Sequence, residues 1–74
     1  MDYVKLVETI NAELEASGIK TIYTLLTNNV SIDTIESLMM NHTKEYHKLT
    51  DNERRGFQAY LKTLRSECKL FSIF

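Results

Sequence analysis

Proline is absent from this sequence, and only two of its 74 residues are glycine. Proline breaks helices and glycine weakens them, so a chain with so little of either favours continuous helices. Flexible linkers are rich in glycine, proline or serine, and no segment has that composition. The sequence therefore predicts helices joined by short connections within one domain, residues 1–74.

A single cysteine, Cys68, narrows the ways in which this chain can be stabilised. It cannot form a disulfide within the chain, and no group of cysteines and histidines has the spacing of a zinc site. A chain of 74 residues buries only about 60% of the surface that its unfolded form exposes. We therefore expect helix packing or a partner chain to supply the stability, and we expect no metal and no cofactor.

Long hydrophobic runs are also missing. No apolar run reaches the roughly 18 to 20 residues that a membrane-spanning helix needs. The N-terminal residues lack the order of a signal peptide, in which a basic stretch precedes an apolar one. We therefore expect a cytoplasmic protein that has no contact with a membrane.

The net charge is only −1, which argues against indiscriminate binding to nucleic acid. The charges are unevenly distributed, however. Residues 1–53 carry four basic and nine acidic side chains, a balance of −5, whereas residues 54–74 carry five basic and one acidic, a balance of +4. The last segment is thus a cationic element attached to an anionic body.

Apolar residues recur at helical spacing in four segments, which predicts an all-α fold, a small three- to four-helix antiparallel bundle. The first expected helix covers about residues 2–16, and Gly18 supplies its C-terminal stop. The second covers about residues 20–28, although its threonines also suit a β-strand. The asparagine pair that ends this segment favours a turn, because asparagine tolerates left-handed backbone angles.

The third and fourth expected helices have recognisable starts. The hydroxyl of Ser31 can cap the third helix, whose apolar face we expect to extend through His42 and Tyr46. Thr50 and Glu53 have the spacing of a capping box and mark the start of the fourth helix. The apolar stripe of that helix comprises Phe57, Tyr60, Leu61, Leu64, Cys68 and Phe71.

Five basic side chains fall within one quadrant of the fourth helix, at 100° per residue. They are Arg54, Arg55, Lys62, Arg65 and Lys69. Clustered cations attract anions, so this ribbon is a candidate surface for an acidic protein or for the phosphates of a nucleic acid. The alternative is a solvated face that glutamates of the neighbouring helices partly neutralise.

The C-terminal residues are unusually apolar for a chain end. Termini often fray, yet this one carries Phe71, Ile73 and Phe74. We expect these side chains to dock, either on the first two helices or on a second copy or another partner.

Residues 21–38 resemble the helix-turn-helix of many repressors, because the run that starts at Asn29 echoes their Gly-Val-Ser-x-x-Thr-Val pattern. Two features oppose DNA binding by this segment. Leu25 stands where such motifs usually have alanine for close helix packing. Asp33 and Glu36 lie in the first turns of the recognition helix, where carboxylates repel phosphates.

No residue set indicates catalysis. His42 and His47 are five residues apart, so on a continuous helix they diverge by roughly 140° and cannot share a metal. Cys68 lies on an apolar stripe, which favours a small buried side chain over a nucleophile. With no nucleophile and base pair and no phosphate-binding loop, we do not expect an enzyme.

The run from Ser31 to Glu36, together with Tyr46, residues 49–53 and Phe57, resembles the Hha/YmoA family of small nucleoid-associated modulators. The resemblance covers about half of the chain. It implies an all-helical protein that joins an oligomeric nucleoid repressor through acidic side chains and offers basic ones to DNA. In this sequence the partner-facing acids would be Asp33 and Glu36.

These patterns predict a non-enzymatic regulatory or adaptor protein that binds another protein within a bacterial or phage transcriptional or nucleoid complex. One alternative is a small helix-turn-helix regulator of phage or plasmid type that binds DNA directly. Another is a helical subunit whose role is structural and which forms homo-oligomers.

Overall fold

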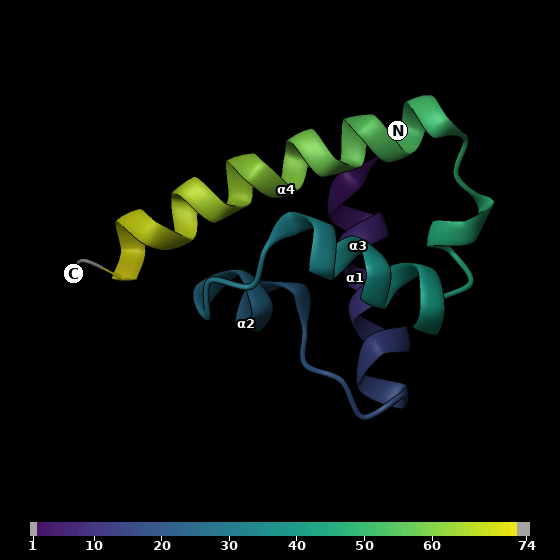
Figure 1. Ribbon diagram of the computed structural model, residues 1–74, viewed down its shortest axis with the longest axis horizontal. Coiled ribbons are helices and arrows are strands. Elements are labelled where there is room, and N and C mark those ends of the chain that lie inside the picture. Colours follow the sequence, from purple (N-terminus) through teal and green to yellow (C-terminus); the bar gives the residue numbers. More distant parts are fainter. Residues whose placement is uncertain (1, 73–74) are drawn as a thin grey trace.

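The computed structural model describes the backbone of residues 2–72 and the side chains of residues 2–67. This part of the chain folds into four α-helices and one 3-10 turn and contains no strand, so the prediction of a small all-α bundle is confirmed (Figure 1). Between residues 2 and 72, no helix is both long enough and apolar enough to cross a membrane. The elements are α1 (Tyr3–Ala16), α2 (Ile22–Thr27), α3 (Ile32–His42), η1 (Tyr46–Lys48) and α4 (Asp51–Ser72).

Side-chain caps begin each α-helix. The predicted cap of α3 is confirmed, since the Ser31 hydroxyl accepts a hydrogen bond from the Thr34 amide at 3.2 Å. The capping box of α4 is reciprocal: the Glu53 carboxylate accepts from the Thr50 amide at 2.9 Å, and the Thr50 hydroxyl accepts from the Glu53 amide at 3.2 Å. These bonds satisfy amides that have no partner within the helix, which is why the sequence located these starts correctly.

Two helices end at residues in the left-handed backbone region. Gly18 follows α1 with a φ of 79°, and Asn29 follows α2 with a φ of 62°. After each, the next amide bonds back across the last turn, from Ile19 to the Leu14 carbonyl at 2.8 Å and from Val30 to the Leu25 carbonyl at 3.0 Å. Both stops were predicted from residue type, because glycine and asparagine tolerate this conformation best.

The threonine-rich segment that also suited a strand is the helix α2. Thr21 caps it, and the Thr27 hydroxyl donates to the Tyr23 carbonyl at 2.8 Å, so both hydroxyls serve the helix. The side-chain oxygen of Asn11 in α1 accepts from the Ile22 amide at 2.8 Å. A tertiary contact therefore supports a helix of only six residues, which is too short to be stable alone.

The predicted extension of α3 through Tyr46 is wrong. The helix ends at His42, because Thr43 has an extended backbone, with φ −126° and ψ 148°. The Thr43 hydroxyl instead donates to the Met39 carbonyl at 2.7 Å and closes the last turn. His42 is exposed, whereas Tyr46 is fully buried but reaches the core from η1.

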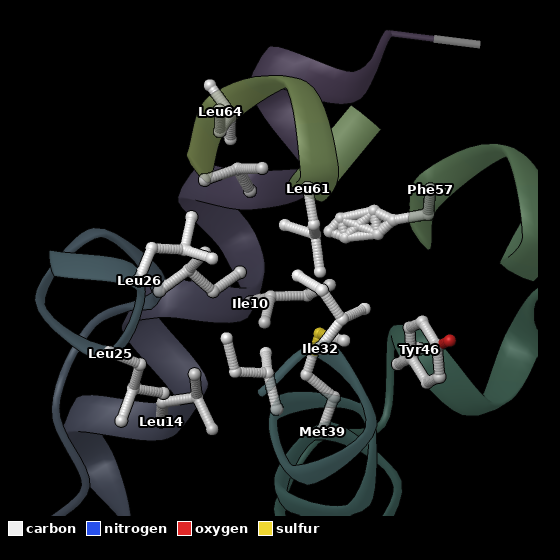
Figure 2. Packing of buried hydrophobic residues seen from close by; sticks show 13 residues of the cluster. Ile10, Leu14, Leu25, Leu26, Ile32, Met39, Tyr46, Phe57, Leu61 and Leu64 are labelled. Atoms are coloured by element: carbon white, nitrogen blue, oxygen red, sulfur yellow. The ribbon is translucent and has the colours of Figure 1, made fainter. Parts of the chain in front are cut away.

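The longest helix, α4, lies along one side of the molecule, and the shorter elements pack beneath it (Figure 1). Its predicted apolar stripe is confirmed for Phe57, Leu61 and Leu64, which are buried against residues of every other element. Figure 2 shows these side chains meeting those of α1, α2 and α3 in one cluster. The remaining core members are Val7, Ile10, Leu14, Ile22, Leu25, Leu26, Ile32, Ile35, Met39 and Tyr46.

An aromatic contact joins the start of α1 to α4. The Tyr3 ring stacks on Phe57 and Tyr60, with ring centroids 6.1 Å and 5.2 Å away. Its hydroxyl lies over Gly56, so close that a β-carbon added there would be 2.4 Å from the Tyr3 oxygen. Glycine lowers the helix propensity of α4 at position 56, but the absence of a β-carbon there leaves the space that the Tyr3 hydroxyl occupies.

This contact predicts that the effect of Gly56→Ala on the free energy of unfolding depends on the side chain at position 3. In a Tyr3→Phe background the hydroxyl is gone, so Gly56→Ala should raise the free energy of unfolding by about 0.5–1 kcal/mol through helix propensity. In the chain with Tyr3, the gain should be lost or reversed, because the ring must leave its stack. Urea unfolding of the four chains of this double-mutant cycle measures the difference, and equal effects in both backgrounds would refute the close contact.

Candidate functional site

The five predicted basic side chains of α4 do not form one surface, because Arg54 is engaged within the fold. Its guanidinium lies 5.8 Å from the centroid of the Tyr46 ring. It also donates to the His47 carbonyl at 3.4 Å and lies 3.6 Å from the Asp51 carboxylate. With a side chain only 26% exposed, Arg54 fastens η1 to α4 and does not present its charge to a partner.

Three of the other basic residues form what we call the basic face: Arg55, Lys62 and Arg65. Arg55 and Lys62 are exposed, and Arg65 is half-buried at the edge of the core. Arg55 and Lys62 are two turns apart, about 10 Å along the helix axis, and lie on the side opposite the buried stripe. The exposed residues between and beyond them, Ala59 and Ser66, are small, so the two charges stand clear of their neighbours.

None of the basic face is neutralised by an ion pair with another described side chain. Among residues 2–67 the ion pairs are Lys48 with Glu45 and Arg54 with Asp51. The glutamates that could have neutralised the face lie elsewhere or are engaged. Glu13, for example, accepts a hydrogen bond from the Lys44 amide at 2.7 Å. The charge of the basic face is therefore available to an anionic partner.

The two predicted partner-facing acids have different environments. Asp33 is exposed in the first turn of α3. Glu36 is half-buried, and one of its carboxylate oxygens accepts from the Tyr46 hydroxyl at 2.6 Å and also from the Gln58 amide. Only Asp33 is free for an outside partner, because Glu36 links α3 to η1 and α4.

We call Glu36, Tyr46 and Gln58 the polar cluster. Burial and the hydrogen bond to Glu36 raise the pKa of the Tyr46 hydroxyl from 10.0 to about 12. The Tyr46 ring packs 5.9 Å from Phe57, centroid to centroid, at one end of the core (Figure 2). Sequence reasoning missed this cluster, because its members come from three elements and no spacing in the chain relates them.

The segment that resembles a helix-turn-helix does fold as two helices joined by a tight turn, α2 and α3, with Asn29 in the left-handed region. Its charges do not suit DNA, however. Residues 21–43 contain no lysine or arginine, while Asp33 and Glu36 occupy the helix that would enter the groove. Lysine and arginine supply most of the electrostatic affinity of such proteins for phosphates, and this pair of helices contains neither.

The two histidines do not lie on one continuous helix. His42 ends α3, whereas His47 lies in η1 with its Nε2 against the Met40 carbonyl. In the described part of the chain, no three histidine, cysteine, aspartate or glutamate side chains gather closely enough to hold a metal ion.

Several predicted residues fall outside the described side chains. These include one basic residue of the predicted ribbon, the single cysteine and the apolar C-terminal residues. They are Lys69, Cys68, Phe71, Ile73 and Phe74.

Comparisons of this chain with protein-family models, with curated proteins and with solved structures find no match. The resemblance to the Hha/YmoA family therefore stays a prediction, and the function has to be argued from the residues themselves.

The polar cluster predicts a loss of stability at high pH. The folded pKa of Tyr46 is above its unfolded value, so its contribution is complete below pH 10 and is lost as the pH rises from 10.0 toward about 12. Tyr46→Phe should remove this part of the pH dependence. It should also lower stability at neutral pH by about 1–3 kcal/mol, because a hydrogen bond to a charged group is lost.

Urea unfolding at a series of pH values measures both effects. Tyr23→Phe is the matched control, since Tyr23 is 45% exposed and, among residues 2–67, its hydroxyl has no carboxylate partner of the kind that Tyr46 has in Glu36. If the free energy of unfolding depends on pH in the same way in Tyr46→Phe and in the unmodified chain, Tyr46 is not the group that causes the loss of stability at high pH.

Proposed function

We propose that this chain is a non-enzymatic regulatory or adaptor domain that binds an acidic protein surface through the basic face of α4. The observation that carries the proposal is the exposure of Arg55 and Lys62 on the outer side of α4, without an ion pair to any described side chain. A helix packed on three others presents these charges in a fixed arrangement. Binding then requires little further ordering of the chain, which reduces its entropic cost.

The charge distribution supports a protein partner over free duplex DNA. The body of the molecule is acidic: residues 2–50 carry four basic and seven acidic side chains, a balance of −3, and they lie beneath α4. A duplex is a uniformly anionic rod, so this body would be repelled wherever the DNA extends beyond α4. A protein can offer a local acidic patch to the basic face and avoid that repulsion.

The more specific form of the proposal places the chain in a transcriptional or nucleoid complex. It rests on the resemblance of the α3 and α4 sequences to the Hha/YmoA family. In this form Asp33, exposed at the start of α3, contacts the partner together with the basic face, and Glu36 acts by holding α3 against α4.

The basic face is tested by reversing its charges. We expect the double variant Arg55→Glu and Lys62→Glu to bind a fluorescein-labelled oligoglutamate peptide at least about tenfold more weakly, a loss of about 1.4 kcal/mol. The matched control is Lys5→Glu with Lys20→Glu, which changes the net charge equally at exposed positions of other segments. Fluorescence anisotropy at low salt gives the affinities, and thermal unfolding confirms that each variant is folded.

Equal losses in the two double variants would refute a localised basic face. The same titration with a labelled random-sequence duplex distinguishes the DNA-binding alternative. If the duplex binds more tightly than the peptide and Arg55→Glu with Lys62→Glu abolishes this binding, α4 contacts phosphates and the protein-binding proposal fails.

A further inference from the structure

A second exposed surface lies on the other side of α4. We call Tyr3, Tyr23 and Tyr60 the tyrosine patch. On a helix with 100° per residue, Tyr60 is about 160° around the axis from Lys62, so the patch and the basic face point in different directions. No sequence pattern joins these three tyrosines, which come from α1, α2 and α4.

The patch is aromatic and accessible. Tyr23 is 45% exposed, and Val4, next to Tyr3 in the chain, is 56% exposed; these are the exposed large hydrophobic side chains of the described residues. Tyr3 and Tyr60 are half-buried and stack with their ring planes 21° apart. Tyrosine is enriched at protein interfaces, because its rigid ring buries a large area while its hydroxyl can remain hydrated.

Two carboxylates lie near the stacked rings of Tyr3 and Tyr60, those of Asp2 and Glu67. Burial raises the pKa of the Tyr60 hydroxyl, and the nearby Tyr23, Glu67 and Asp2 raise it further. Glu67 is exposed on the same side of α4 as Tyr60, two turns further along, and Asp2 is exposed at the cap of α1, next to Tyr3.

Aromatic faces beside carboxylates suit one kind of ligand group. A guanidinium stacks on a tyrosine ring through its attraction to the π electrons and forms paired hydrogen bonds with a carboxylate. The same site disfavours an acidic segment, because Asp2 and Glu67 would repel it. The chemistry of the patch is thus the reverse of that of the basic face.

We propose that the tyrosine patch, with Asp2 and Glu67 at its rim, is a second docking surface and that it takes an arginine-bearing segment of another protein. The basic face and the tyrosine patch then allow the domain to bridge an acidic and a basic partner, as an adaptor does. This inference does not depend on the binding of the acidic partner, since the two surfaces share no residue.

The test uses a fluorescein-labelled peptide of Gly-Arg repeats and the full chain. Anisotropy is measured at an ionic strength of about 20 mM, because exposed charges are screened beyond about 10 Å at 0.1 M. The double variant Tyr23→Ser and Glu67→Gln should bind at least about fivefold more weakly, the combined effect of one exposed cation–π contact and one surface ion pair. Both side chains are exposed, so this variant should fold normally, and circular dichroism checks that it does.

The matched control is Glu15→Gln, which removes one exposed carboxylate at the opposite end of α1 and should change the affinity less than twofold, the scale of one surface charge. Equal weakening by the control and the patch variant would show general charge attraction and overturn the proposal. Absence of binding by the unmodified chain would overturn it as well.

Sedimentation without the peptide tests a second copy as the occupant. If the mass rises with protein concentration, and if both the patch variant and the variant Arg55→Glu with Lys62→Glu abolish this rise, the patch binds the basic face of another copy. That result would overturn the proposal that the patch binds a different protein. A constant mass supports the proposal. The patch variant should still bind oligoglutamate. A loss of Gly-Arg binding by the patch can therefore be distinguished from a loss of oligoglutamate binding by the basic face.

Discussion

The burial of the apolar stripe of α4 is the contact on which the rest of this structure depends. Phe57, Leu61 and Leu64 are the buried residues of α4 as far as residue 67, where the described side chains end, and they meet the core side chains of the other helices. Burying a side chain of this size contributes about 1.5–3 kcal/mol. A domain of this size is stable by only about 5–15 kcal/mol, so α1, α2 and α3 could not remain packed without these three.

The same packing decides which surfaces α4 can offer. Once the stripe faces inward, Arg55 and Lys62 must face outward, and Tyr60 must lie at the border with α1 and α2. The two proposed docking surfaces are therefore consequences of one buried stripe. Their separation is fixed by the rotation of the helix and does not require a mobile segment.

Local chemistry in the sequence was sufficient for most of the helix boundaries. Ser31 and Thr50 began helices and Gly18 ended one, because caps and left-handed stops depend on residues a few positions apart. Tyr46 shows where local reasoning fails. Its spacing from Ile35 and Met39 fitted α3, but the extended Thr43 ended the helix, and burial of the ring was achieved from a 3-10 turn. Periodicity indicates which residues are buried, but it does not show which helix or turn carries each of them into the core.

The sequence by itself determined that the chain is all-helical, where its caps lie and that its positive charge is concentrated in the last helix. Only the tertiary structure decided which of those charges are available. Arg54 has the same charge as the exposed Arg55, and Glu36 has the same charge as the exposed Asp33. Yet Arg54 lies against the Tyr46 ring, and Glu36 accepts hydrogen bonds from two elements. The physical reason is that the availability of a side chain depends on what packs beside it. Those neighbours come from distant positions in the chain, which no local pattern specifies.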